Sequence, residues 1–375
     1  MFIKKDLRKI PKILQDAVAV EQPEDYYDSA TEDTTSEHAA KKVKRTQALK
    51  ELKLARRQQE FQGSVSILCG QPRSLLLPKL ALLESLNLYD CGISNLDGIG
   101  VLGEGRCPHL AVVNLGRNPI ESLPDEFGTL QSIQELWLDD CQALAGQPVP
   151  QCLGRLVNLT SLRASHCGFT ELPDTVVQGW SNLELLCLDR NQLTQLPSNM
   201  SGALKNLRQL LLRHNPLTAL DDDLFADMPR LQLLHLSSCP QLTQLPTSLL
   251  QCTNLTHLWA NHCALTELIP HGDWEDTFVH LERLVLSHNP ITFASVPASF
   301  WNRFGNPNLE TGIITTTCND NGNDSSSTCQ VLLQGTPVLK ELSSQEQQLQ
   351  LQDDEEEEQD TSFEQMDASM DVDNE

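Results

Sequence analysis

Four histidines recur at matching places along the chain and are the residues best suited to chemistry. His166, His214 and His262 are spaced 48 residues apart, and His288 follows 26 residues later. Imidazole can bind Zn²⁺ or carry a proton near neutral pH. A zinc site needs a third and a fourth ligand at similar depth, and the residues beside His262 and His288 are Asn, Ser and Trp. We therefore expect a polar, partly titratable rim at these positions, with no metal and no cofactor.

Motifs that would support catalysis are missing from the sequence. A nucleophile needs a base within hydrogen-bond reach and a third group that orients the base. The chain has no Gly-rich phosphate loop, no CxxC pair and no HExxH motif. We predict that it is not an enzyme and that it has no catalytic residues.

The histidines belong to a repeat that fixes their positions. The unit reads L-x-x-L-x-L-x-x-(N/C)-x-(L/I), and its starts lie 23 to 27 residues apart, with four consecutive intervals of 24. The nine units start at Leu83, Leu110, Ile133, Leu159, Leu183, Leu207, Leu231, Leu255 and Leu281. A regular period of this length is typical of stacked units that bury their apolar sides against each other. The sequence therefore predicts a solenoid.

Each unit reads as a short strand followed by a turn. At positions four and six, Leu210 and Leu212 point to the core, whereas Gln209, Leu211 and Arg213 point to solvent. Position nine is Asn or Cys and turns the chain inward. There an amide can satisfy backbone groups of neighbouring turns, and a thiol can fill the same small volume. The four histidines all occupy position eight.

This unit resembles the leucine-rich repeat family over roughly residues 83–291. Segments such as Leu172-Pro173 and Leu196-Pro197 are similar to those of the intracellular and typical subclasses. The resemblance implies an α/β leucine-rich repeat solenoid, a horseshoe with a concave parallel β-sheet and short helical or irregular convex connections. Ala164 and Ala260 depart from the leucine of position six, and the segment 141–158 departs from the usual spacing.

The solvent-facing positions of this strand ladder form the candidate binding surface. Trp and Arg are enriched in binding hot spots, and an exposed Trp in a strand suggests that a partner covers it. Trp137 and Trp259 are five repeats apart, roughly 24 Å at about 4.8 Å per strand, which suits a protein partner. The alternative is that each Trp only packs against its neighbours on adjacent strands. The predicted partner-binding residues are Tyr89, Asp90, Arg117, Trp137, Asp139, Asp140, Arg163, His166, Asp189, Arg190, Leu211, Arg213, His214, His235, Trp259, His262 and His288.

Cysteine placement and hydropathy favour a reducing compartment. Five of the 12 cysteines occupy position nine, and Cys107, Cys152 and Cys252 lie in the connections. The sequence lacks the paired cysteines that cap extracellular relatives, so we expect reduced structural thiols. It also lacks an uninterrupted apolar stretch of about 18 residues, and its charged start does not resemble a signal peptide. We expect a cytoplasmic monomer without a membrane span and without a nucleic-acid partner.

The net charge of −24 is unevenly distributed and delimits the flanks. Residues 1–62 hold 13 Lys/Arg and 11 Asp/Glu, residues 63–339 hold 13 and 26, and residues 340–375 hold 1 and 14. We expect a mostly disordered flank (1–37), a basic helix and N-terminal cap (38–82), the solenoid (83–291), a C-terminal cap with a polar loop (292–339) and a disordered acidic tail (340–375). Within the C-terminal cap, Val331, Leu333 and Val338 are predicted to form a last strand.

Two classes of function are consistent with this organisation. The first is an intracellular scaffold similar to the Ras-suppressor and Shoc-type proteins and the plant intracellular Ras-group-related proteins, which implies small GTPases or phosphatases as partners. The second is a nuclear acidic regulator similar to the acidic leucine-rich nuclear phosphoproteins, which implies basic partners such as histones, bound through the tail. The basic cluster Lys41–Arg45 matches a nuclear import signal and leaves the nucleus open as a location.

Overall fold

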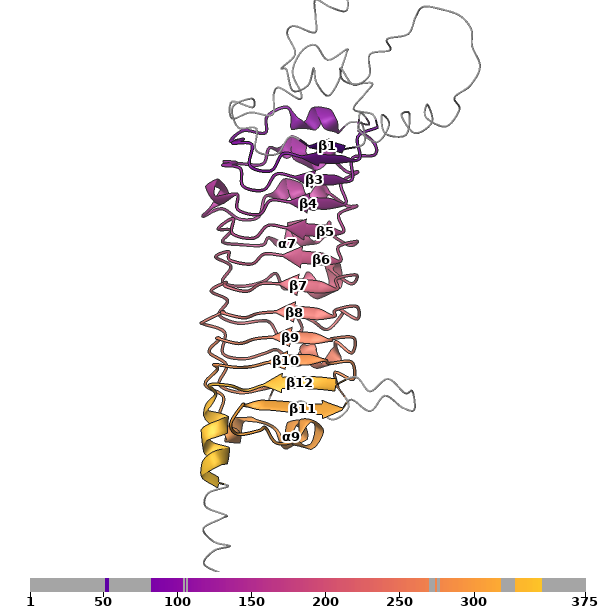
Figure 1. Ribbon diagram of the computed structural model, residues 1–375. Helices are drawn as coiled ribbons and strands as arrows, with labels where there is room; N and C mark the ends of the chain where they lie inside the picture. Colours follow the sequence, from indigo (N-terminus) through magenta and orange to yellow (C-terminus); the bar gives the residue numbers. More distant parts are fainter. Residues whose placement is uncertain are drawn as a thin grey trace, which may run out of the picture.

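The strands of the protein stack into one long ladder, which runs the length of the molecule in Figure 1. The computed structural model describes residues 51–53, 82–103, 105, 107–269, 274, 277–317 and 328–345. Within these residues, 12 strands form one sheet in the order β1-β2-β3-β4-β5-β6-β7-β8-β9-β10-β12-β11. The strands are β1 (Glu51–Lys53), β2 (Ser85–Asn87), β3 (Val112–Asn114), β4 (Glu135–Trp137), β5 (Ser161–Arg163), β6 (Leu185–Cys187), β7 (Gln209–Leu211), β8 (Leu233–His235), β9 (His257–Trp259), β10 (Arg283–Val285), β11 (Ile313–Thr317) and β12 (Thr328–Leu332).

The predicted repeat register is confirmed by the strand pairing. Strands β2 to β10 each span positions three to five of one of the nine units, and each pairs in parallel with the next. Position four therefore faces position four throughout, as Leu186, Leu210 and Leu234 do. The sheet and its short connections form the solenoid with a long parallel β-sheet that the sequence predicts.

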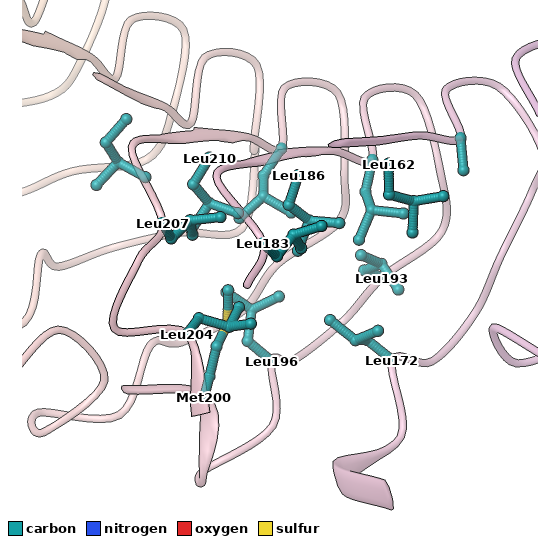
Figure 2. Close-up of a cluster of buried hydrophobic side chains, with 14 of the residues drawn as sticks. Leu162, Leu172, Leu183, Leu186, Leu193, Leu196, Met200, Leu204, Leu207 and Leu210 are labelled. Atoms are coloured by element: carbon teal, nitrogen blue, oxygen red, sulfur yellow. The ribbon is translucent and has the colours of Figure 1, made fainter. Parts of the chain in front are cut away.

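The core is a continuous apolar column behind this sheet. Leucines at positions one, four and six, such as Leu183, Leu186 and Leu188, are completely buried. Figure 2 shows leucines from successive repeats pointing into the same interior space. No unit can bury these side chains alone, so stacking supplies the stability of the fold.

Position nine holds neighbouring turns together through hydrogen bonds. The side-chain oxygen of Asn191 accepts the backbone N–H of Cys167 at 3.2 Å and of Phe169 at 3.0 Å. Its amide nitrogen donates to the carbonyl oxygens of Ala164 at 2.9 Å and Leu188 at 2.8 Å. One buried side chain thus satisfies four backbone groups on two turns.

Cysteines at position nine form fewer hydrogen bonds between neighbouring turns than the asparagines do. The Cys167 thiol donates to the carbonyl of Leu138 at 3.0 Å, and the Cys263 thiol to that of Leu236 at 3.2 Å. The ten cysteines among the described residues are buried free thiols. Burial raises the pKa of the Cys141 and Cys252 thiols to about 12, which keeps them protonated.

Short helices cover the side of the solenoid opposite the sheet, as the resemblance implied. Several begin directly after proline, whose fixed φ suits the first helical turn. Pro124, Pro173 and Pro246 precede such helices. The described helices with defined bounds are η2 (Ile99–Leu102), η3 (Asp125–Thr129), η4 (Gln142–Leu144), η5 (Gln151–Arg155), α7 (Asp174–Val177), α8 (Met200–Ala203), η6 (Thr247–Gln251), η7 (Phe293–Ser295) and α9 (Ala298–Phe304). None of the described helices is long and apolar enough to cross a membrane.

The irregular segment 141–158 keeps the solenoid continuous. It holds η4 and η5, and its Leu144, Val149 and Leu153 side chains are buried in the common core. An additional turn, with Gly146 at φ 79°, accommodates the extra length. The departure in spacing therefore changes the connection and leaves strands β4 and β5 paired.

The C-terminal cap differs from its prediction, because part of the segment expected to be a polar loop is a strand. Strand β12 pairs in parallel with β10 and contains Val331, as predicted for a last strand. Leu333 follows this strand and Val338 lies in a helical stretch that starts at residue 337, so the prediction was wrong for these two residues, although both side chains are buried in the core. However, Ile313–Thr317 form β11, which pairs antiparallel with β12, so part of the predicted loop is a β-hairpin. The run of isoleucine and threonine explains this difference, because β-branched residues favour strands. The remaining loop residues, 318–327, lie outside the described residues.

The N-terminal flank also departs from its predicted conformation where it is described. Glu51–Lys53 form β1, which pairs in parallel with β2, whereas the sequence analysis expected a basic helix there. The segment 49–54 reads L-x-x-L-x-L, the same strand signature as the nine units, and this pattern outweighs the helix propensity of its residues. The predicted flank 1–37, the rest of the basic segment with its cluster Lys41–Arg45, and residues 346–375 lie outside the described residues. Residues 340–345, predicted as the start of a disordered tail, are helical instead, and Leu342 packs against the core there.

Candidate interaction surface

The side of the sheet that faces away from the core presents positions three and five of the nine repeats, which we call the sheet face. Because side chains alternate along a strand, both positions point away from the buried leucine of position four. In β9, for example, His257 and Trp259 flank the buried Leu258 and are themselves half-buried. The short strands thus hold these side chains in rows at a regular spacing.

The middle of the sheet face is apolar and aromatic. Leu185, Leu211 and Leu233 stand on consecutive strands and are half-buried. The Trp259 ring lies 5.0 Å from the ring of His235 on the neighbouring strand and 5.2 Å from that of His257 on its own strand. Packing of the rings gives a rigid aromatic cluster whose outer side remains open to solvent.

Trp137 stands closer to the N-terminal end of the same face. Its register partners are Asn114 on β3 and Arg163 on β5. Arg163 is exposed, whereas Asn114 is only 8% exposed. Trp137 is half-buried, so both tryptophans pack against neighbouring strands and also present surface to solvent.

Two position-five residues that sequence analysis placed towards solvent are buried. Asn114 accepts the backbone N–H of Gly116 at 3.0 Å, which folds its side chain back onto the strand end. Cys187 is 3% exposed, and its sulfur lies 3.1 Å from the hydroxyl oxygen of Ser165. Because these two side chains are short, the longer side chains around them provide the exposed surface of the sheet face.

Asp189, a predicted partner-binding residue, is also buried and acts within the fold. It is 6% exposed and accepts the backbone N–H of Arg213 at 2.9 Å. Its second carboxylate oxygen lies 2.8 Å from Nε of Arg213. Burial raises the pKa of Asp189, and the charge and hydrogen bonds of Arg213 oppose that rise. Asp139 makes the same type of bond, to the backbone N–H of Ser165 at 2.8 Å.

Position eight forms a rim along one edge of the sheet and has a conformation that the sequence analysis did not anticipate. All nine position-eight residues have positive φ, between 54° and 62°. They are Asp90, Arg117, Asp140, His166, Arg190, His214, Ser238, His262 and His288. Histidine and aspartate are among the residues that tolerate this left-handed conformation best. The left-handed backbone conformation therefore explains why histidine and aspartate recur at position eight.

The rim histidines are arranged for stacking and ion pairing. The rings of His262 and His288 stack at 4.3 Å with an interplanar angle of 11°. Nδ1 of His166 lies 2.8 Å from a carboxylate oxygen of Asp140, and both residues line an open depression together with Arg117. Among the described residues, no group of three His, Cys, Asp or Glu side chains is placed to hold a metal ion.

Charge divides the surface into two halves. Near β2 to β4, the acidic residues Asp90, Glu135, Asp139 and Asp140 predominate. Further along, Arg190 and Arg213 flank His214, and burial together with these two cations lowers its pKa. Burial, Arg213 and His214 likewise lower the pKa of His235 to about 4, so its ring is neutral at pH 7.

Position three was absent from the predicted partner-binding residues, although Gln209 was expected to point to solvent. The residues at position three belong to the same face as position five because they lie two residues earlier on the strand. The alternation that identified Leu211 and Trp259 would have found them. The larger side chains at this position are Glu135, Leu185, Gln209, Leu233, His257 and Arg283.

The family match supports the repeat assignment over residues 157–265. Residues 157–217 and 205–265 match the leucine rich repeat family. A region of 203 residues is 26% identical to Disease resistance protein RPS4B of Arabidopsis thaliana, and it spans 54% of this chain but only 14% of that relative. A leucine-rich repeat protein of Leptospira interrogans has a solved structure with 21% sequence identity and a TM-score of 0.36, over 71% of this chain and 79% of that one.

Proposed function

We propose that this protein is a non-enzymatic scaffold that binds a protein partner on the sheet face. Leucine-rich repeats generally serve as protein-interaction scaffolds, and the described residues present a face of the type used for this purpose. The observation that carries the proposal is the aromatic cluster of His235, His257 and Trp259, which is half-buried by its own neighbours and still open on its outer side.

The composition of the face supports a protein rather than a metabolite as ligand. An apolar centre bordered by charged residues is the usual anatomy of a protein interface. From Trp137 on β4 to Trp259 on β9 the ladder covers five strand spacings, roughly 24 Å at about 4.8 Å each. By the resemblance noted above, we propose intracellular signalling proteins such as small GTPases or phosphatases as partners, in the cytoplasm.

Affinity capture with the full chain tests this proposal. Tagged wild-type protein and the variants Trp137→Ala and Trp259→Ala are used to capture partners, which are quantified by mass spectrometry. Each substitution should weaken the main partner by about fivefold or more, because hot-spot aromatics contribute more than about 1 kcal/mol. Val157→Ala and Val279→Ala serve as controls, because both valines are 45% exposed and lie on connections away from the sheet.

The captured set also shows where the interface lies. Partners that are lost with the two tryptophan variants and retained with the two valine variants bind the sheet face. If the tryptophan variants melt like the wild type and retain every partner, the interface lies elsewhere and the proposal is wrong.

A further inference from the structure

The apolar centre of the sheet face has no covering among the described residues. Leu185 and Leu233 stand at position three of β6 and β8, and Leu211 and Trp259 stand at position five of β7 and β9. These four side chains therefore alternate between two adjacent columns of the sheet, and we call this zigzag set the apolar row. These side chains are all half-buried, so part of each is in contact with water. Covering such a row is favourable for any segment that brings apolar side chains of its own.

Cations surround this row, although the solenoid as a whole is acidic. At positions three, five, seven and eight of the fourth to ninth repeats there is one acid, Asp189, which pairs with Arg213. The cations at these positions are Arg163, Arg190, Arg213 and Arg283, and Arg163 lies 3.5 Å from Asp139 of the third repeat. At position two, Glu184 lies 3.3 Å from Arg208, and Glu282 lies 4.0 Å from His257. The connections on the opposite side carry exposed acids instead, such as those at 221–223.

The C-terminal segment of this chain has the complementary chemistry. Residues 346–375 contain 13 Asp/Glu and no Lys or Arg. Within them, Phe363, Met366 and Met370 are separated by three and four positions, with acids between them. The segment thus combines apolar anchors with negative charge, which matches an apolar row bordered by arginines.

The segment is also long enough to reach this row. The described chain ends at Gln345, in a helical stretch that starts at residue 337 and extends beyond β12 at the end of the ladder (Figure 1). From β12 back to β6 is about 24 Å at 4.8 Å per strand, and nine helical residues add about 13 Å. The 18 residues from Gln345 to Phe363 can span about 60 Å when extended.

We propose that residues 346–375 bind the sheet face of their own chain. Phe363, Met366 and Met370 contact the row formed by Leu211, Leu233 and Trp259, and the acids of the segment lie beside Arg163, Arg190 and Arg213. This inference extends the proposed function, because an external partner then competes with the segment for the same face. It also specifies the partner chemistry that the face selects, an acidic peptide with spaced apolar side chains.

A labelled synthetic peptide of residues 346–375 tests the inference with two full-length chains. One is the wild type, and the other carries Phe363→Ser, Met366→Ser and Met370→Ser. Fluorescence anisotropy should show that the peptide binds the triple variant and binds the wild type at least about tenfold more weakly, because a tethered segment acts at millimolar effective concentration. Raising the salt concentration should weaken binding, because exposed charges are screened.

Substitutions on the face, made in the triple-variant chain, locate the site. Arg190→Glu and Leu211→Ser should each weaken the peptide at least about fivefold. Arg230→Glu makes the same charge change at an exposed residue off the face and should leave the affinity unchanged. Thermal melts establish that each variant is folded.

Three results would overturn the inference. Equal peptide affinity for the wild type and the triple variant would show that the chain's own segment does not occupy the face. A mass that rises with concentration in ultracentrifugation of the wild type, but not of the triple variant, would assign the segment to a second copy. Absence of peptide binding to the folded triple variant would show that the segment does not recognise the sheet face. The proposed function would not be affected by that result, because partner capture that depends on Trp259 tests it separately.

Discussion

At the scale of single residues, position nine shows how one side chain can connect two turns of the solenoid. The Asn191 side chain bonds four buried backbone groups, whereas the Cys239 thiol donates to a single carbonyl, that of Leu212, at 3.6 Å. Both residues satisfy the same repeat pattern, yet their contributions to stability differ. The cost of losing each one follows from the backbone groups left without a partner.

We predict that Asn191→Ala lowers the free energy of unfolding by about 3 kcal/mol or more. Cys239→Ala should lower it by about 1 kcal/mol, because the thiol makes only weak bonds, to the Leu212 carbonyl and the Cys263 thiol, and fills a small volume. Urea denaturation of the two variants and the wild type measures both values. Equal losses would contradict the role assigned to the asparagine.

His235 couples stability to pH. In the folded chain its pKa is about 4, whereas an unfolded histidine has a pKa of about 6.5. Between these values the unfolded state binds more protons, so stability falls as the pH is lowered from about 6.5 towards 4.

We predict that His235→Gln removes this part of the pH dependence. Between pH 7 and pH 4.5 the wild type should lose about 1 kcal/mol more stability than the variant does, which is less than the full pKa shift corresponds to because solvent screens the partly exposed ring. Chemical denaturation at the two pH values provides the comparison. Parallel losses in both proteins would show that His235 titrates in the fold as it does when unfolded.

Residue-level features of the surface were only partly predictable from the sequence. The alternation of Leu210 and Leu212 with Leu211 was enough to assign core and face. The burial of Asp189 was not predictable, because it depends on the backbone N–H of Arg213 in the next repeat, a contact between residues 24 positions apart. The positive φ of His214 and of the other position-eight residues was also not predictable, because the repeat pattern specifies residue types and not dihedral angles.

At the scale of elements, close packing between connections restricts the residues that can occupy them. Gly179 follows α7 at a place where a Cβ atom would lie only 1.7 Å from the carbonyl oxygen of Gly154, which belongs to η5 on the preceding turn. In α8, by contrast, a Cβ atom on Gly202 would meet nothing within 4 Å. The two glycines therefore have different structural roles.

We predict that Gly179→Ala destabilises the protein by about 2 kcal/mol or more, because the connections must move apart. Gly202→Ala should be neutral or stabilise by about 0.5 kcal/mol, since alanine favours the helical conformation. Thermal and urea unfolding of both variants and the wild type measures these changes in stability. A harmless Gly179→Ala would show that the two connections are less tightly packed than described here.

The elements at the two ends explain most differences between expectation and structure. The segment 49–54 has helix-forming residues and a strand signature at once, and pairing of β1 with the open edge of β2 selects the strand. At the other end, β11 adds an antiparallel strand beside β12. Both outcomes depend on a sheet edge that is available for pairing, which a local pattern does not reveal.

At the scale of the whole molecule, the stacked repeats turn separate residues into one extended surface. The apolar row on β6 to β9 and the surrounding arginines come from units that are 24 residues apart in the sequence. The spacing of the repeats predicted the ladder of strands. The separation of acidic from basic residues along the ladder was not predicted, because it depends on where the turn residues lie in the structure. The central claim is that a protein partner covers this face.

Hydroxyl-radical footprinting of the complex captured with the full chain tests that claim most directly. The chain used carries Phe363→Ser, Met366→Ser and Met370→Ser, so that its own C-terminal segment does not protect the face before the partner binds. Side-chain oxidation of Trp137, His257 and Trp259 should fall several-fold in the complex relative to this free chain. Trp301 in α9, which is also half-buried but lies outside the strands, should be oxidised equally in both. Unchanged oxidation of the three sheet-face residues, with protection confined to the connections, would contradict the account.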